Sequence, residues 1–125
     1  MAKTSWEAKS AGGVLIDSDG LDASITAATA LDVSPYGKCG FQINVDNTTY
    51  DAVGTWSFEE TIDGVNWNTI TFNDGTTTIA LASSTNLDQM VLLETCARMV
   101  RPVYTRTSGG GAGTSAWVHG HVVRK

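Results

Sequence analysis

The chain has 125 residues, 17% of them charged, and a formal net charge of −5 at pH 7. This length predicts a single domain that buries a core of its own. The acidic balance argues against nucleic-acid binding, since neutralising phosphates takes a clustered excess of lysine and arginine. No apolar run approaches the length that crosses a membrane, so no membrane partner is expected.

Thirteen glycines, together with many threonines, serines and asparagines, predict an all-β protein. Threonine and β-branched residues suit pleated strands, whereas glycine and asparagine suit the turns between them. The first residues include two lysines but no apolar segment behind them, so they do not form a secretory signal. We therefore expect a protein that is made in a cytoplasm.

Residues 1–12 have no regular apolar period and end at a pair of glycines. They predict an N-terminal arm that precedes a single β-sandwich domain over residues 13–125. Lys3, Trp6 and Lys9 are its candidate partner-binding residues, because a tryptophan supplies much buried area at an interface. The alternative is that Trp6 packs back on its own domain.

Strand-like segments then follow at short intervals, separated by glycine, proline and asparagine turns. The interval 84–99 fits either a helical stripe or a strand, and a strand is favoured because every neighbouring segment alternates. In total we expect eight or nine strands, at residues 14–17, 24–33, 40–46, 53–61, 67–72, 76–82, 88–93, 99–107 and 114–124. Pro102 cannot donate to a ladder, which predicts an edge or a bulge in its strand.

A single sheet of this size would leave much apolar surface exposed to solvent, so two packed sheets are expected. The absence of a strand–helix–strand pattern favours an antiparallel β-sandwich with a jelly-roll or immunoglobulin-like topology. The glycine-rich segment 108–113 is expected to close a hairpin between the last two strands. The predicted core consists of Phe41, Ile43, Val45, Trp56, Phe58 and Val103. Trp117 lies inside an alternating strand, so it is also expected to be a core residue.

The sequence contains only weak patterns for a metal site or for catalytic residues. His119 and His121 share a strand face with Trp117, but two ligands do not make a zinc site, so no metal is expected. Glu59 and Glu60 point to opposite faces of one strand and cannot act as a catalytic pair. No nucleophile motif accompanies them, so no enzymatic activity and no cofactor are expected.

Three further residues carry expectations about contacts. Glu60 falls on the side of the core, where it is expected to find an ion-pair partner in Arg98 or Arg101. Cys39 and Cys96 lie far apart without a metal-ligand spacing, which favours free thiols over a disulfide.

Trp67 follows the Asp63-Gly64 turn and is the tryptophan best placed for exposure. It is the fourth candidate partner-binding residue. Exposed aromatic faces also stack on sugar rings, which keeps a carbohydrate-binding function open.

The stretches at residues 63–67, 97–101 and 104–109, DGVNW, ARMVR and YTRTSG, resemble small β-sandwich proteins of tailed bacteriophages, including cement or decoration proteins. The resemblance covers the second half of the chain. It implies a jelly-roll or related fold, no enzymatic activity, and a place on the capsid exterior of a virion made in the host cytoplasm. It also implies binding to the major capsid protein, as a homodimer or homotrimer. The alternative is a carbohydrate-binding module or a tail-fibre adhesin domain.

Overall fold

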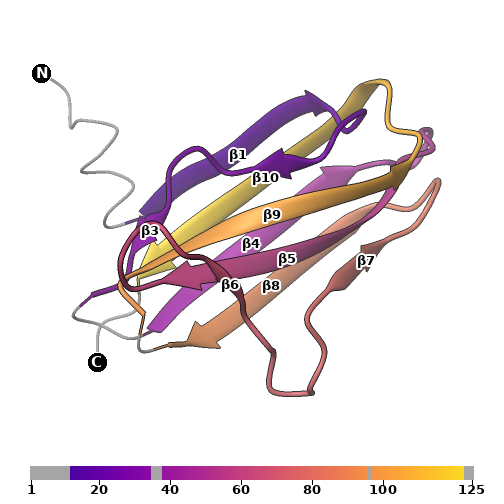
Figure 1. Ribbon diagram of the computed structural model, residues 1–125. Helices are drawn as coiled ribbons and strands as arrows, with labels where there is room; N and C mark the ends of the chain where they lie inside the picture. Colours follow the sequence, from indigo (N-terminus) through magenta and orange to yellow (C-terminus); the bar gives the residue numbers. More distant parts are fainter. Residues whose placement is uncertain (1–11, 35–37, 96, 123–125) are drawn as a thin grey trace, which may run out of the picture.

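The computed structural model describes residues 12–34, 38–95 and 97–122, which form strands and turns without a helix (Figure 1). The predicted arm, with Lys3, Trp6 and Lys9, and also Cys96 lie outside the described residues. The strands are β1 (Gly12–Gly20), β2 (Ile25–Thr26), β3 (Leu31–Asp32), β4 (Lys38–Asp46), β5 (Val53–Thr61), β6 (Asn68–Thr69), β7 (Ile79–Leu81), β8 (Leu87–Glu94), β9 (Met99–Ser108) and β10 (Ala112–Val122).

These strands form two antiparallel sheets in a sandwich-like, all-β arrangement (Figure 1). Sheet A has the order β1-β10-β4-β8. Sheet B has the order β2-β9-β5-β6, and within it β3 also pairs with β9 and β7 also pairs with β5. The expectation of an all-β antiparallel fold is confirmed, and the described residues form ten strands rather than eight or nine.

The core lies between the sheets, where the inward faces of β4 and β5 meet. Phe41 of sheet A packs on Phe58 of sheet B with 4.5 Å between ring centroids, and Trp56 packs on Tyr104 at 4.9 Å. All of the predicted core residues on β4 and β5 are buried: Phe41, Ile43, Val45, Trp56 and Phe58. Their regular alternation of apolar and polar positions is what a strand with one buried face requires.

Val103 is a wrong prediction, because it is only half-buried and lies on the outer face of sheet B. Its neighbours Pro102 and Tyr104 point into the core instead. In the segment from Val100 to Tyr104, both sets of alternate positions contain apolar residues. The alternation of this strand therefore does not say which set is buried.

The sequence predicted that Pro102 lies in an edge strand or at a bulge, and neither is found. β9 is flanked by β5 and by β2 and β3, and the β5–β9 register is regular at Pro102. The carbonyl of Pro102 accepts a hydrogen bond from the amide of Ala27, at 3.1 Å. A residue's N–H and C=O point to the same side of a strand, so the missing N–H of the proline faces the gap between β2 and β3. The predicted strand at 24–33 is broken at this point, which accommodates the proline.

The Asp63-Gly64 turn joins two paired strands, β5 and β6, as a hairpin should. The glycine-rich segment does not, since β9 belongs to sheet B and β10 to sheet A. This segment carries the chain across the sandwich and packs closely on its neighbours. Gly110 is buried with φ of 86°, and its amide donates to the carboxylate of Asp51 at 3.0 Å.

Asn47 follows β4 and is fully buried, which its sequence context did not indicate. Its side-chain amide donates to the carbonyls of Ala52 and Ala82 at 3.0 and 2.9 Å, and its side-chain oxygen accepts from the amide of Ala52. A buried side chain with all these partners stabilises the loops it joins. Here it ties the β4–β5 connection to the segment between β7 and β8.

Candidate binding surface

Trp67 was predicted to be the exposed tryptophan, and the structure places it differently. It is half-buried under the side chain of Arg101, whose guanidinium carbon lies 3.8 Å from the ring centroid. The same guanidinium forms an ion pair with Glu59 at 2.8 Å. Arg101 thus joins β9 to the β5–β6 hairpin and covers one face of the Trp67 ring.

The ion pair of Arg101 also corrects the expectation for Glu60. Glu59 and Arg101 are directly opposite each other in the β5–β9 register, and so they share a face of sheet B. Glu60 points to the other side and accepts a hydrogen bond from the hydroxyl of Thr95. The sequence gives no information about register, and the register decides which glutamate meets the arginine.

Trp117 is the exposed tryptophan, with 52% of its surface accessible, so its prediction as a core residue is wrong. It does share a face of β10 with His119 and His121, as expected from their spacing, but this face is the outer one. The core face of β10 consists of Thr114, Ala116, Val118, Gly120 and Val122. These small and branched residues fit the narrow space opposite Leu15 and Phe41, where a tryptophan would not fit.

In the part of the chain that the structure describes, most of the exposed large apolar side chains lie on the outer face of sheet A. Six such side chains are exposed among the described residues, and four of them belong to this face: Val14 (39%), Met90 (75%), Leu92 (64%) and Trp117 (52%). The pairing registers align them in rows across all four strands. One row is Val14, His119, Gln42 and Met90, and the next is Asp17, Trp117, Asn44 and Asp88.

Apolar and polar groups therefore alternate on this outer face. A flat surface with aromatic and methionine side chains among amides, and few charges at its centre, has the composition of a protein-binding surface. We call the outer face of sheet A, with Val14, Gln42, Met90, Leu92 and Trp117, the sheet A surface.

A shallow depression of about 270 Å³ lies beside Trp117 at one end of the sheet A surface. The indole N–H of Trp117 donates to the carboxylate of Asp17 at 3.0 Å, and the ring lies edge-on to His119 with 6.4 Å between centroids. The polar side chains that line the depression are Asn44, Asp46, Asn86, Asp88 and Ser115. An exposed aromatic ring next to amides and carboxylates can both stack on and hydrogen-bond a sugar.

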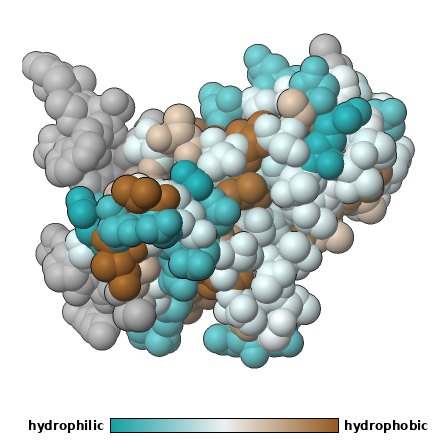
Figure 2. All heavy atoms as spheres, viewed as in Figure 1, coloured by the Kyte–Doolittle hydropathy of each residue, from teal (hydrophilic) through white to brown (hydrophobic). Residues whose placement is uncertain are grey.

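The other two exposed apolar side chains, Ile62 and Val65, belong to the β5–β6 turn. Figure 2 shows hydrophobic atoms gathered at the end of the molecule where this turn lies. Asp63 organises the turn by accepting hydrogen bonds from the amides of Asn66 and Val65, both at 2.8 Å, and these bonds hold the pKa of its carboxyl well below its ordinary value. The turn is a rigid, apolar tip beside sheet B.

Within the ranges that the structure describes, no group of three or more histidine, cysteine, aspartate or glutamate side chains is arranged to hold a metal ion. The same part of the chain has no helix long and apolar enough to cross a membrane. Cys39 is a free, buried thiol whose pKa is raised to about 12 by burial and by the nearby charge of Glu60. It is part of the core rather than a reactive group.

Comparison with known proteins returned no matching family model, no matching curated protein and no matching solved structure.

Proposed function

We propose that this protein is a non-enzymatic structural component of a virion, bound to the outer surface of a phage capsid, where it staples neighbouring major capsid subunits. The observation that carries the proposal is the sheet A surface, which gathers four of the six exposed large apolar side chains on one face. A monomeric protein has little reason to concentrate apolar groups in this way unless another surface covers them. The second half of the chain resembles phage cement proteins, which supports a capsid as the surface that covers these apolar groups.

We infer a jelly-roll topology as part of this proposal. If β2 with β3, and β6 with β7, are each counted as one interrupted strand, the chain has eight strands. When these eight strands are numbered along the chain, neighbouring strands follow the order 1-8-3-6 in sheet A and 2-7-4-5 in sheet B. This alternation between sheets is the order of a double-sheet jelly roll, an arrangement found in many capsid-associated domains.

Binding to a capsid also fits the energetics of the sheet A surface. Its exposed apolar area is divided by Gln42, Asn44 and His119, so one copy on its own makes a contact of modest strength. A capsid offers many identical sites related by symmetry, and a dimer or trimer of the protein binds several of them at once. Effective concentration then raises the overall affinity without any additional contact.

A second candidate, a carbohydrate-binding or adhesin domain, is favoured by one specific observation. Trp117 lies exposed beside a depression lined by Asn44, Asp46 and Asp88, and its ring is oriented by Asp17. In this reading Trp117, and not Trp67, is the sugar-stacking residue. The two functions share a face of the molecule and Trp117, but only capsid binding also depends on Met90 and Leu92.

The test distinguishes the two functions by changing different residues of the sheet A surface. Purified protein is mixed with capsids of the phage that encodes it, assembled without it, and the bound fraction is measured by sedimentation. We expect saturable binding and a gain in capsid resistance to heat, with binding weakened by Met90→Ser combined with Leu92→Ser. Ile62→Ser with Val65→Ser, at the other exposed apolar site, is the matched control.

Failure to bind these capsids would contradict the proposal. If the protein instead bound a glycan in a manner abolished by Trp117→Ala and unaffected by Met90→Ser with Leu92→Ser, the adhesin function would replace it.

A further inference from the structure

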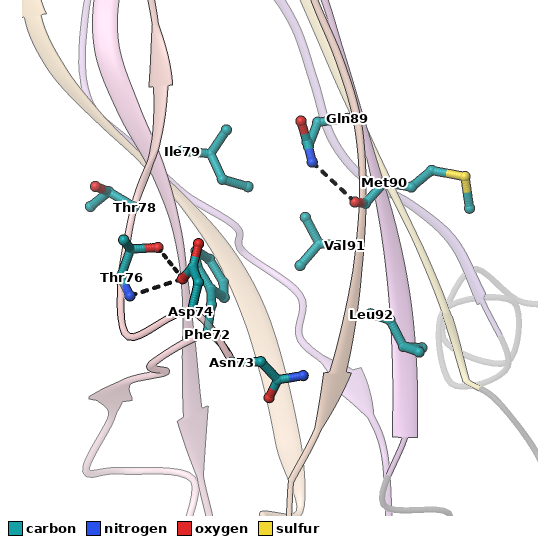
Figure 3. A pocket seen from close by; sticks show the side chains of 10 residues that line it. All are labelled: Phe72, Asn73, Asp74, Thr76, Thr78, Ile79, Gln89, Met90, Val91 and Leu92. Carbon is teal, nitrogen blue, oxygen red and sulfur yellow. Dashed lines mark hydrogen bonds between the residues drawn. The ribbon is translucent and has the colours of Figure 1, made fainter.

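The sandwich is open along one side, between the edge strand β8 of sheet A and the short strand β7 of sheet B. A groove of about 470 Å³ runs there. Figure 3 shows Val91 of β8 and Ile79 of β7 on opposite walls, with Phe72 below, whereas Met90 points away from the groove. Phe72, Ile79 and Val91 therefore give the groove an apolar part. Polar side chains line the rest of it: Asn73, Asp74, Thr76, Thr78 and Gln89.

β8 is an unprotected edge. Among the described strands it pairs with β4 alone, along eight residue pairs and without a bulge. Its sequence, LDQMVLLE, contains no proline and no lysine, which are the residues that usually block an open edge. Alternate N–H and C=O groups of β8 face the open side. A strand of this kind is a template for the addition of another strand.

The surroundings of β8 define the chemistry of the strand that would fit. Alternate side chains of an added strand would point into the groove against Val91 and Ile79, so at least one of them should be large and apolar. The other side chains would lie on the outer face near Asp88 and Glu94. Lys38 already lies 3.6 Å from Glu94, but the two carboxylates outnumber this one lysine, which favours positive charge there. The fitting strand has an apolar anchor on one face and lysines on the other.

Residues 2–10 of this chain, AKTSWEAKS, have this composition. They contain only one large apolar residue and so no apolar period, but in an extended conformation Thr4, Trp6 and Ala8 share one face. Lys3 and Lys9 share the other face with Glu7, which leaves it with a net positive charge. We propose that this segment of a second copy adds to β8 as a strand, with Trp6 in the groove and the two lysines beside Asp88 and Glu94.

The position of β1 means that the segment added to β8 must come from a second copy of the protein. Residue 12 begins β1, which is the edge of sheet A opposite β8, three inter-strand spacings or about 14 Å away. A strand added outside β8 lies one spacing further, about 19 Å from β1, and crossing that distance takes about six residues at ~3.3 Å each. Within one copy Trp6 would then only reach the end of β8, and too few residues would remain to pair along the strand.

The experiment uses the purified full chain without any capsid, so that its outcome is independent of the proposed function. Self-association is measured by sedimentation equilibrium, and amide exchange of β8 is measured at concentrations above and below the dissociation constant. We expect association in the wild type with β8 protected only at the higher concentration. Trp6→Ala should weaken association by about thirtyfold or more, as loss of a buried interface tryptophan does.

Two further variants keep the result interpretable. Trp117→Ala removes an exposed tryptophan elsewhere and should leave association unchanged. Lys3→Glu with Lys9→Glu retains Trp6 and should weaken association by charge repulsion, with circular dichroism unchanged. A monomer at all concentrations, protection of β8 that persists on dilution, unchanged association of Trp6→Ala, or unfolding of Trp6→Ala would each overturn the proposal.

Discussion

Trp117 and Asp17 are direct neighbours across the β1–β10 pair, and the indole N–H of Trp117 donates to the carboxylate of Asp17 at 3.0 Å. This hydrogen bond fixes the orientation of a ring that is 52% exposed. An aromatic ring held in place before binding loses less conformational freedom on binding than a freely rotating one. The pair therefore prepares Trp117 to contact a partner.

Trp117→Ala should leave the fold almost unchanged and weaken attachment to the capsid. Because the ring contributes little to the core, the free energy of unfolding should change by no more than about 0.5 kcal/mol. Within a bound surface, loss of a tryptophan that anchors the contact costs about 2 kcal/mol or more. Thermal unfolding and capsid sedimentation measure the two effects, and a large loss of stability with normal binding would disagree with this assignment.

Gly110→Ala should destabilise the protein far more than Gly75→Ala, although both glycines have φ of 86°. The left-handed conformation costs alanine about 1–2 kcal/mol at either site. A Cβ at Gly110 would in addition lie 2.1 Å from the carbonyl oxygen of Leu21, whereas nothing lies within 4 Å of a Cβ at Gly75. Denaturant unfolding of the two variants tests the difference, and equal losses would show that the β9–β10 connection is not packed as described.

Cys39 should be inert in the folded protein. Its thiol is fully buried, and burial, with the charge of Glu60, raises its pKa to about 12, so almost no thiolate is present at pH 8. In a Cys96→Ser background, iodoacetamide should label Cys39 only after denaturant is added. Because the unfolded thiol ionises near 9.0, stability should also fall as pH rises above that value. Rapid labelling of the native protein would contradict the buried position.

The Asp63 turn should make stability depend on acid pH. Hydrogen bonds from the amides of Asn66 and Val65 lower the pKa of Asp63 below its ordinary value of 3.8, so its contribution is complete above that pH. It is lost as pH falls from about 4 towards the lowered pKa. Asp63→Asn should therefore lower the melting temperature at pH 7 and have a smaller effect in stronger acid. An effect independent of pH would show that the charge does not matter.

Much of sheet B and of the central core follows from local sequence. β5 has the predicted bounds, 53–61, because Trp56 and Phe58 alternate with polar residues and the Asp63-Gly64 turn ends the strand. The preference for a strand over a helix at residues 88–93 is also confirmed by β8. Alternation and turn chemistry are local, and a single sequence contains both.

The candidate surface depends on information that is not local. Trp117 was predicted to be a core residue because it lies in an alternating strand, but the core face of β10 is the other set of positions, where a Cβ at Gly120 would already lie 3.0 Å from Phe41. The assignment of β9 and β10 to different sheets depends on pairing with β5 and β4, which are distant in sequence. Exposure of Trp117 and burial of Trp67 under Arg101 both follow from such long-range pairing.

The most direct test of the sheet A surface as the capsid-binding face is side-chain footprinting with hydroxyl radicals on the capsid-bound protein. Methionine and tryptophan are readily oxidised, and Met90 and Trp117 lie on this face with 75% and 52% exposure. We expect both side chains to become protected on capsids while the exposed Ile62 and Val65 of the β5–β6 turn remain reactive. Unchanged oxidation of Met90 and Trp117 in the bound protein, with protection of the turn, would contradict it.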